Sequence, residues 1–295
     1  MANNRLSTYN PAVVFLFFMG AIVLGMFFIH PLFLCVSVLL SAVYYLSLKG
    51  AKGGRLIGVL MIIFIGISVI NPVFNTLGDT TLFTYSGGRR YTLEALAYGA
   101  ATGMMFISVM LWFACYNLVM TSDKFIYLFG RLLPSISLIL TMVLRLVPRF
   151  QKKLAAISGA RKCIGMAGGG TRSEKTMHAA ATVSALTSWA LEGTVESSDA
   201  MRSRGYGLPG RTSFNIYRFG KRDIAMITEM LLLISLVIVC ATQGVAYVRY
   251  IPTIELPGMT TSSIIGVTAY AVLLSIPSVM KFSEDIKWRI LRSRI

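Results

Sequence analysis

The amino-acid sequence predicts an all-α integral membrane protein with about six transmembrane helices and a group of cytoplasmic amphipathic helices. The 295 residues are 55% hydrophobic and only 14% charged, whereas soluble domains carry about a quarter charged residues. Apolar runs long enough to cross a membrane recur along the chain, and one long basic segment interrupts them. The formal net charge of +16 is typical of basic cytoplasmic loops in a membrane protein, so it does not indicate nucleic-acid binding.

A transmembrane helix needs about 20 largely apolar residues. The sequence contains runs of this kind at about 12–30, 32–48, 56–74, 95–120, 224–248 and 263–281. The corner His30–Pro31 separates the first two runs, which predicts either a tight hairpin or two short tilted spans. No small-residue cleavage site follows the first run, so we interpret it as a retained helix and not as a signal peptide.

Basic residues are distributed unevenly about these runs. With the N-terminus inside, all but three of the 28 Lys and Arg residues are cytoplasmic, the exceptions being Arg89, Arg90 and Arg249. The positive-inside rule applies to short loops, so the loop at 49–55 and the C-terminal tail carry the inference. The sequence therefore predicts four N-terminal spans in 1–121, a cytoplasmic helical region in 122–223, and two spans with a basic tail in 224–295, with both termini cytoplasmic.

The segment 122–223 shows apolar residues at helical spacing, which predicts amphipathic helices at or below the inner membrane surface. A first helix is expected to start at Pro134 and to end or kink at Pro148. A second is expected over about 148–163, stopped by Gly165 and the glycine run at 168–170. A third is expected over about 175–204. It could instead be a short membrane span, but its charged final third leaves too short an apolar run.

Two arginines in this segment share a local pattern. Arg161 and Arg204 each lie near the C-terminal end of a predicted helix, with Ala160 or Ser203 before them and a glycine close behind. Cations favour helix C-termini and the inner leaflet in general, which is the plainer explanation of any single arginine here. Small neighbours, however, leave a guanidinium accessible to another chain, and the pattern occurs twice.

These residues also carry a resemblance. The run LAAISGARKCIG, followed by SSDAMRSRGYGLPGRT, resembles the transmembrane T component of energy-coupling factor transporters, ABC importers of vitamins and metal ions that include cobalt and biotin transporters. The resemblance covers about 134–223. Two residues depart from the family pattern, Lys162 in place of a glycine and Ser203 in place of an alanine. The matching positions are Ala200, Met201, Arg204, Gly205, Tyr206, Gly210, Arg211, Thr212, Arg222 and Asp223, with Glu196 where the family commonly has an acid.

The resemblance implies a non-catalytic coupling subunit in a bacterial or archaeal cell membrane. Its partners would be two ABC ATPase subunits, membrane lipid and a small membrane subunit that binds and selects the substrate. Arg161 would contact one ATPase and Arg204 the other. The two coupling motifs would comprise Ala160, Arg161 and Lys162, and Ser203, Arg204 and Gly205, with Glu196, Asp199, Ala200 and Met201 in support. Glu192, Glu196 and Asp199 share one helix face, so they could brace Arg202 or Arg204, pair with ATPase cations, or form ordinary ion pairs within the helix.

The sequence offers no catalytic machinery of its own. The stretch GGGTRSEK at 168–175 does not match the P-loop pattern, and we interpret it as a hinge. Four scattered cysteines and two histidines predict no metal site, and we expect no cofactor. Glu229 is the acid placed inside a span, either with a substrate role or paired with Lys221 or Arg222. The competing class is a self-sufficient secondary transporter or channel, which needs polar groups at mid-membrane depth that the spans lack.

Overall fold

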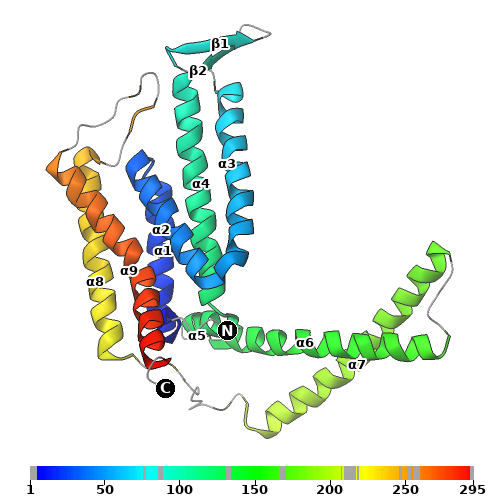
Figure 1. Cartoon of the computed structure of the whole chain (residues 1–295). Coiled ribbons are helices and arrows are strands. Elements are labelled where there is room, and N and C mark those ends of the chain that lie inside the picture. Colours follow the sequence, from blue (N-terminus) through cyan, green and yellow to red (C-terminus); the bar gives the residue numbers. More distant parts are fainter. Residues whose placement is uncertain are drawn as a thin grey trace. The chain divides into compact units, whose positions relative to one another are not determined.

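The structure is a computed structural model of the whole chain, shown in Figure 1. It describes residues 5–75, 78–85, 89–130, 134–165, 171–206, 208, 217, 219–245, 248–250, 254 and 260–292. The chain divides into two compact units, one formed by Met1–Phe125 with Tyr217–Ile295 and the other by Ile126–Ile216. The second unit lies inside the predicted helical region of 122–223.

The first unit is built from long apolar helices (Figure 1). They are α1 (Pro11–Phe27), α2 (Pro31–Lys49), α3 (Gly54–Phe74), α4 (Leu93–Val119), α8 (Lys221–Cys240) and α9 (Thr261–Arg292). The helices α1 and α2 each begin with a proline at the first helical position, preceded by a residue whose side chain caps the helix. Asn10 accepts the Ala12 N–H at 3.0 Å, and His30 accepts the Leu32 N–H at 3.2 Å. The corner at His30 therefore has the local role of a helix cap.

Four helical stretches in the described chain are long and apolar enough to cross a membrane, which supports an integral membrane protein. They are Pro31–Phe74, Leu93–Val119, Lys221–Gly244 and Thr261–Arg292. The 44-residue stretch Pro31–Phe74 contains both α2 and α3, which are joined by the 3-10 helix Gly50–Gly53, where Gly50 has a φ of +63°. The helix α1 has 17 residues, below the length of the four stretches. The predicted count of about six spans is therefore not confirmed by this criterion.

The core of the first unit is a buried aromatic and hydroxyl cluster. The indole of Trp112, on α4, is fully buried and lies edge-to-face against Phe17 of α1, with ring centroids 5.6 Å apart. Its Nε1–H donates to the Ser37 hydroxyl on α2 at 3.0 Å. Ser37 and Ser108 share a further hydrogen bond of 2.5 Å. Because each polar atom in this cluster has a partner, the cluster joins α1, α2 and α4 without leaving these groups unsatisfied.

The helices α3 and α4 approach each other closely through glycines of α4. A Cβ atom added at Gly99 would lie 2.8 Å from the Cβ of Asn71 and 2.9 Å from the carbonyl oxygen of Ser68. One added at Gly103 would lie 2.9 Å from the ring of Phe64. The small residues of 99–104 therefore form the contact surface of this helix pair.

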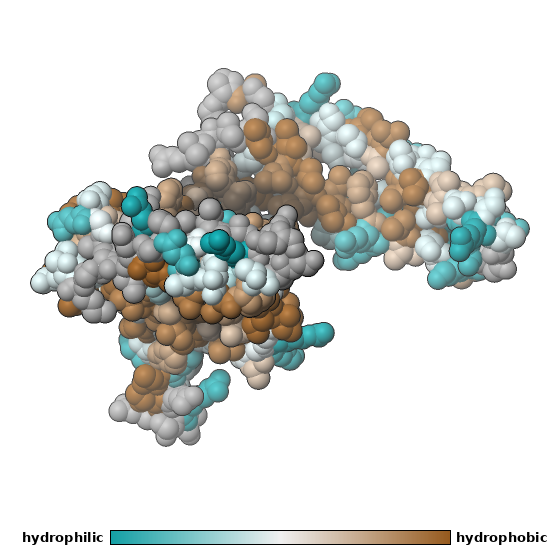
Figure 2. Space-filling view, turned by 90° about the horizontal axis from the view of Figure 1, so that it is seen from above, coloured by the Kyte–Doolittle hydropathy of each residue, from teal (hydrophilic) through white to brown (hydrophobic). Residues whose placement is uncertain are grey.

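The outward surfaces of the same unit are apolar. On α3 and α8, Ile62, Ile65, Leu232 and Val239 are each more than half exposed. Figure 2 shows such side chains, coloured brown, on the outside of the molecule. Apolar surfaces of this extent are what a lipid environment solvates, and they are rare on soluble proteins.

A β-hairpin is the part of the fold that the all-α prediction missed. Strands β1 (Thr81–Tyr85) and β2 (Arg89–Thr92) pair antiparallel, with a register irregularity between Thr81 and Phe83. The rings of Phe83 and Tyr91 stack with centroids 4.6 Å apart. The hairpin precedes α4, and the Glu94 carboxylate in the first turn of α4 accepts the Thr80 N–H at 3.1 Å.

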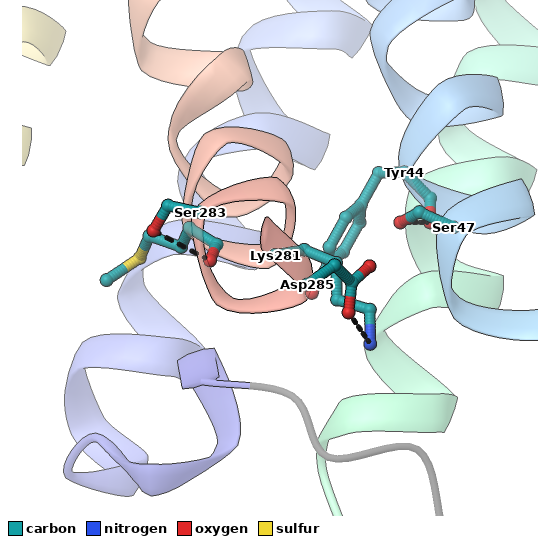
Figure 3. A network of polar contacts seen from close by, with 6 residues as sticks. Tyr44, Ser47, Lys281, Ser283 and Asp285 are labelled. Atoms are coloured by element: carbon teal, nitrogen blue, oxygen red, sulfur yellow. Dashed lines mark hydrogen bonds and ion pairs between the residues drawn. The ribbon is translucent and has the colours of Figure 1, made fainter. Parts of the chain in front are cut away.

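The C-terminal half of α9 carries a small polar group beside α2 (Figure 3). Lys281 is almost fully buried, and its Nζ lies 3.9 Å from an oxygen of the exposed Asp285. In Figure 3 the Lys281 side chain lies beside Tyr44 of α2. The helix continues past this point to Arg292, so the part of the predicted basic tail up to that residue is helical.

The second unit contains two long helices, α6 (Pro134–Cys163) and α7 (Arg172–Ser203); the shorter α5 (Ser122–Gly130) straddles the boundary between the units. The α6 helix corrects the prediction of two helices split at Pro148, because it runs through that proline for 30 residues. Proline removes one backbone donor, and hydrogen bonds on both sides of Pro148 maintain the helix. The predicted third helix is confirmed by α7 to within three residues.

The contact between α6 and α7 centres on Trp189. The ring of Phe150 packs edge-to-face on Trp189 with centroids 5.7 Å apart. The Arg149 guanidinium and the Lys153 ammonium lie 5.8 Å and 5.4 Å from the centre of the indole. No described residue of α7 is fully buried. The pair is therefore held by one aromatic contact with two cation–π interactions and not by a closed core.

Candidate functional site

The arginine of the first predicted motif lies within the last turn of α6. Ala160 and Lys162 are exposed and Arg161 is half-buried. The Ala160 carbonyl accepts the Ile164 N–H at 3.2 Å, and the Lys162 carbonyl accepts the Gly165 N–H at 3.1 Å. The helix therefore continues for two residues beyond Arg161, to Cys163.

The second motif ends α7 in a glycine-closed cap. Gly205 has a φ of +77°, and its N–H donates to the Arg202 carbonyl at 3.0 Å. The Tyr206 N–H donates to the Met201 carbonyl at 3.0 Å. These two hydrogen bonds make a Schellman motif, with Arg204 as the C-cap residue and Gly205 after it. The left-handed backbone explains the glycine, because a Cβ atom would be strained there.

Each of the two arginines is followed by a glycine of positive φ, at a different spacing. Gly165 also has a φ of +77°, four residues after Arg161, whereas Gly205 follows Arg204 directly. The two arginines do not come together. Arg161 contacts α7 near its start, at His178, and Arg204 lies 26 residues further along that helix, or about 39 Å of helix axis.

The supporting residues lie along the last turns of α7. Glu196, Asp199 and Ala200 are exposed, whereas Met201 is half-buried. The Ser203 hydroxyl donates to the Ala200 carbonyl at 3.0 Å, and the Arg204 N–H donates to the same carbonyl at 3.3 Å. The Ser203 hydroxyl is thus occupied by the backbone of its own helix.

The acids of α7 are open to solvent. Glu192, Glu196 and Asp199 are exposed, and in the described part of the chain no ion pair joins them to Arg202 or Arg204. The sequence left open whether these acids brace the arginines, and the structure shows no such brace. Three carboxylates on one exposed face remain available to an outside cation.

The sequence interpretation missed the residue that contacts Arg161. Arg161 Nη2 lies 3.3 Å from Nδ1 of His178, which is half-buried on α7. The pairing needs the antiparallel register of α6 and α7, which no local pattern of the sequence contains. Trp189, the one tryptophan of α7, was the available sequence signal that α7 packs against another helix.

Several other predicted features fall elsewhere. Glu229 is exposed, and no ion pair joins it to Lys221 or Arg222 within the described residues. The buried acid of α8 is Asp223, whose carboxylate accepts the N–H groups of Gly220 at 2.9 Å and Asn10 at 3.1 Å. Asp223 therefore caps α8 and ties it to the start of α1.

The remaining motif positions cannot all be placed. Gly168 to Gly170 and Gly210, Arg211 and Thr212 lie outside the described residues. The residues Arg172 to Lys175 begin α7, where Thr171 and Glu174 form a capping box. The end of the GGGTRSEK stretch is therefore a helix start. Among the described residues, no three His, Cys, Asp or Glu side chains gather as a metal site would require.

No protein-family model matches this chain, and no curated protein matches it either. The class that the described structure defines is a mostly α-helical membrane protein with a separate, largely exposed helical unit.

Proposed function

We propose that this chain is the transmembrane coupling subunit, or T component, of an energy-coupling factor ABC importer. It transmits the ATP-driven motion of two ATPase subunits to a small membrane subunit that binds the vitamin or metal ion. Arg161 contacts one ATPase and Arg204 the other. The chain crosses the membrane about six times with both termini in the cytoplasm, α1 and the two halves of Pro31–Phe74 counting as separate spans.

One observation carries this proposal. In the second unit, two long helices each end in a turn that carries an arginine and is closed by a glycine of positive φ. The point where Arg161 contacts α7 and the position of Arg204 are about 39 Å apart along the axis of α7. A guanidinium at a rigid helix end is a directional joint, because its planar fork donates two parallel hydrogen bonds to one carboxylate. Two such joints at distant points suit two separate subunits better than one.

The apolar side chains of this unit support the same interpretation. Val183, Leu191 and Val195 on α7 are each more than half exposed, as are Ile136 and Ile139 on α6. Side chains of this kind gain about 1.5–3 kcal/mol each on full burial. These side chains become buried only against a membrane surface or partner subunits, and a coupling subunit contacts both.

The test is co-purification of the full-length chain from its native membranes with bound ATPase subunits, identified by their P-loop sequences. We expect Arg161→Glu combined with Arg204→Glu to abolish this association and the uptake activity of the reconstituted complex. The matched control is Lys152→Glu combined with Lys175→Glu, which changes the charge equally at exposed positions of the same helices. The control should retain both activities.

Unchanged ATPase association in the arginine variant would contradict the proposal. Transport by the purified chain alone in liposomes would contradict it as well, and would favour a self-sufficient transporter or channel.

A further inference from the structure

The contact between Arg161 and His178 has a defined direction. A guanidinium carries five N–H donors and no acceptor, so the Arg161 Nη2–H donates and His178 Nδ1 accepts, across 3.3 Å. The imidazole is therefore neutral at Nδ1 in this structure and carries its proton on Nε2. This contact joins the last turn of α6 to the second turn of α7.

A second contact fixes how the two helices run. Phe150 precedes Arg161 on α6 by as many residues as Trp189 follows His178 on α7, and both pairs are in contact. The helices are therefore antiparallel between these contacts, over about 16 Å of helix. The Trp189 contact holds the middle of the pair, and the Arg161–His178 contact holds the end of α6.

We propose that His178 is a positioning residue, which fixes the Arg161 guanidinium to α7 so that both coupling arginines act on one helix. This inference rests on the proposed function and deepens it. Arg204 ends α7 directly, and Arg161 is attached to α7 near its start. The hydrogen bond to His178 occupies one donor of the guanidinium, and the other donors remain for a partner carboxylate. A force on Arg161 then reaches α7 without bending the end of α6.

The contact needs the lone pair of Nδ1 as its hydrogen-bond acceptor. The charged groups around it are Arg161 and Lys162 on α6, and Glu174 and Lys175 one turn earlier on α7. The Glu174 carboxylate is occupied, since it accepts the Thr171 N–H at 3.1 Å. Nδ1 of His178 is therefore the acceptor that the structure gives to Arg161 Nη2.

The first experiment measures the helix pair itself and does not depend on any partner. Spin labels are placed on Cys163 and on Lys175→Cys, both exposed, in the full chain with the other three cysteines replaced by alanine. We expect a narrow distance distribution at pH 7.5. His178→Leu and Arg161→Ala should each increase the separated population about five- to tenfold, the effect of losing one hydrogen bond of typical net strength. The double variant should add nothing further.

The conservative variant distinguishes a hydrogen-bond role from a packing role. Asparagine places an oxygen acceptor close to the Nδ1 position. His178→Asn should therefore keep the narrow distribution that His178→Leu loses. A distribution that His178→Leu leaves unchanged would overturn the inference.

The second experiment measures binding of the ATPase subunits to the same variants. We expect His178→Leu to weaken association about five- to tenfold and His178→Asn to retain it. Equal association of all variants, with the label distances changed as expected, would overturn the positioning role. Absence of ATPase binding to the unmodified chain would instead refute the proposed function, while the label distances would still decide the Arg161–His178 contact.

Discussion

The two units of this protein use long helices in opposite ways. In the first unit, Trp112 is fully buried and surrounded by Phe17, Phe18 and Tyr44, with its indole N–H bonded to Ser37. In the second unit, Trp189 is half-buried, and it contacts one ring and two cations. Both tryptophans join helices, but only the first lies in a closed core.

The difference shows that apolar content alone does not decide burial. The α6 helix carries an apolar stripe, yet Ile136, Val143, Val147 and Leu154 on it are all exposed. A single neighbouring helix covers only one side of a helix surface, whereas α4 packs on α1, α2 and α3. The second unit therefore leaves apolar side chains of α6 and α7 exposed.

The largest expected effect compares the two tryptophans. Trp112→Ala should lower the free energy of unfolding by about 3–5 kcal/mol, because it empties a packed site and removes the indole N–H that donates to Ser37. Trp189→Ala should cost about 1.5–3.5 kcal/mol, the sum of one aromatic pair and two exposed cation–π contacts. Denaturant unfolding in detergent measures both changes. Equal losses would show that the second unit has a core after all.

The next comparison uses two glycines of the α3–α4 pair. Gly99→Ala should destabilise the protein by about 1–3 kcal/mol, because the added Cβ meets Asn71 and Ser68 below 3.0 Å. Gly66→Ala is the matched control, since nothing lies within 4 Å of its added Cβ. It should be neutral or slightly stabilising, because alanine is the better helix former. Thermal melting of the purified variants separates the two, and a loss at Gly66 as large as at Gly99 would contradict this packing.

A smaller effect is expected at the end of α7. Gly205→Ala should cost about 1–2 kcal/mol locally, because alanine at a φ of +77° is strained. Amide hydrogen exchange should show lost protection of Tyr206, whose N–H closes the cap. Gly193→Ala, in the body of the same helix with nothing within 4 Å, should leave that protection intact. Retained protection in the Gly205 variant would mean that the cap does not depend on the left-handed residue.

The smallest effect concerns pH and the first unit. Burial lowers the pKa of His30 below its ordinary value of 6.5, so the unfolded chain takes up a proton at a higher pH than the folded chain does. Stability is therefore full above that ordinary value and decreases as the pH falls below it, since protonation also removes the acceptor for the Leu32 N–H. His30→Asn keeps a cap that does not titrate, so its melting temperature should vary less between pH 7.5 and pH 5.5. Identical pH profiles would exclude His30 as the source.

Much of the fold could be predicted from local pattern. The apolar runs, with the prolines and glycines at their boundaries, predicted α1 to α4, α8 and α9. These helices are predictable because an α-helix makes its backbone hydrogen bonds within one segment, so a run of apolar residues is a sufficient signal. Local signals also placed the ends of α6 and α7 beside Arg161 and Arg204. The β-hairpin at 81–92 was missed because its strands are short, and strand pairing depends on a partner segment.

The sequence by itself determined the membrane class, the positions of the long helices and the two arginine-bearing helix ends, since these follow from composition and from residues within one turn of each other. Only the tertiary structure decided that α6 continues through Pro148, that Asp223 caps α8 against Asn10, and that Arg161 contacts His178. The last two contacts join separate helices, and side-chain spacing within one helix carries no information about which face its neighbour presents.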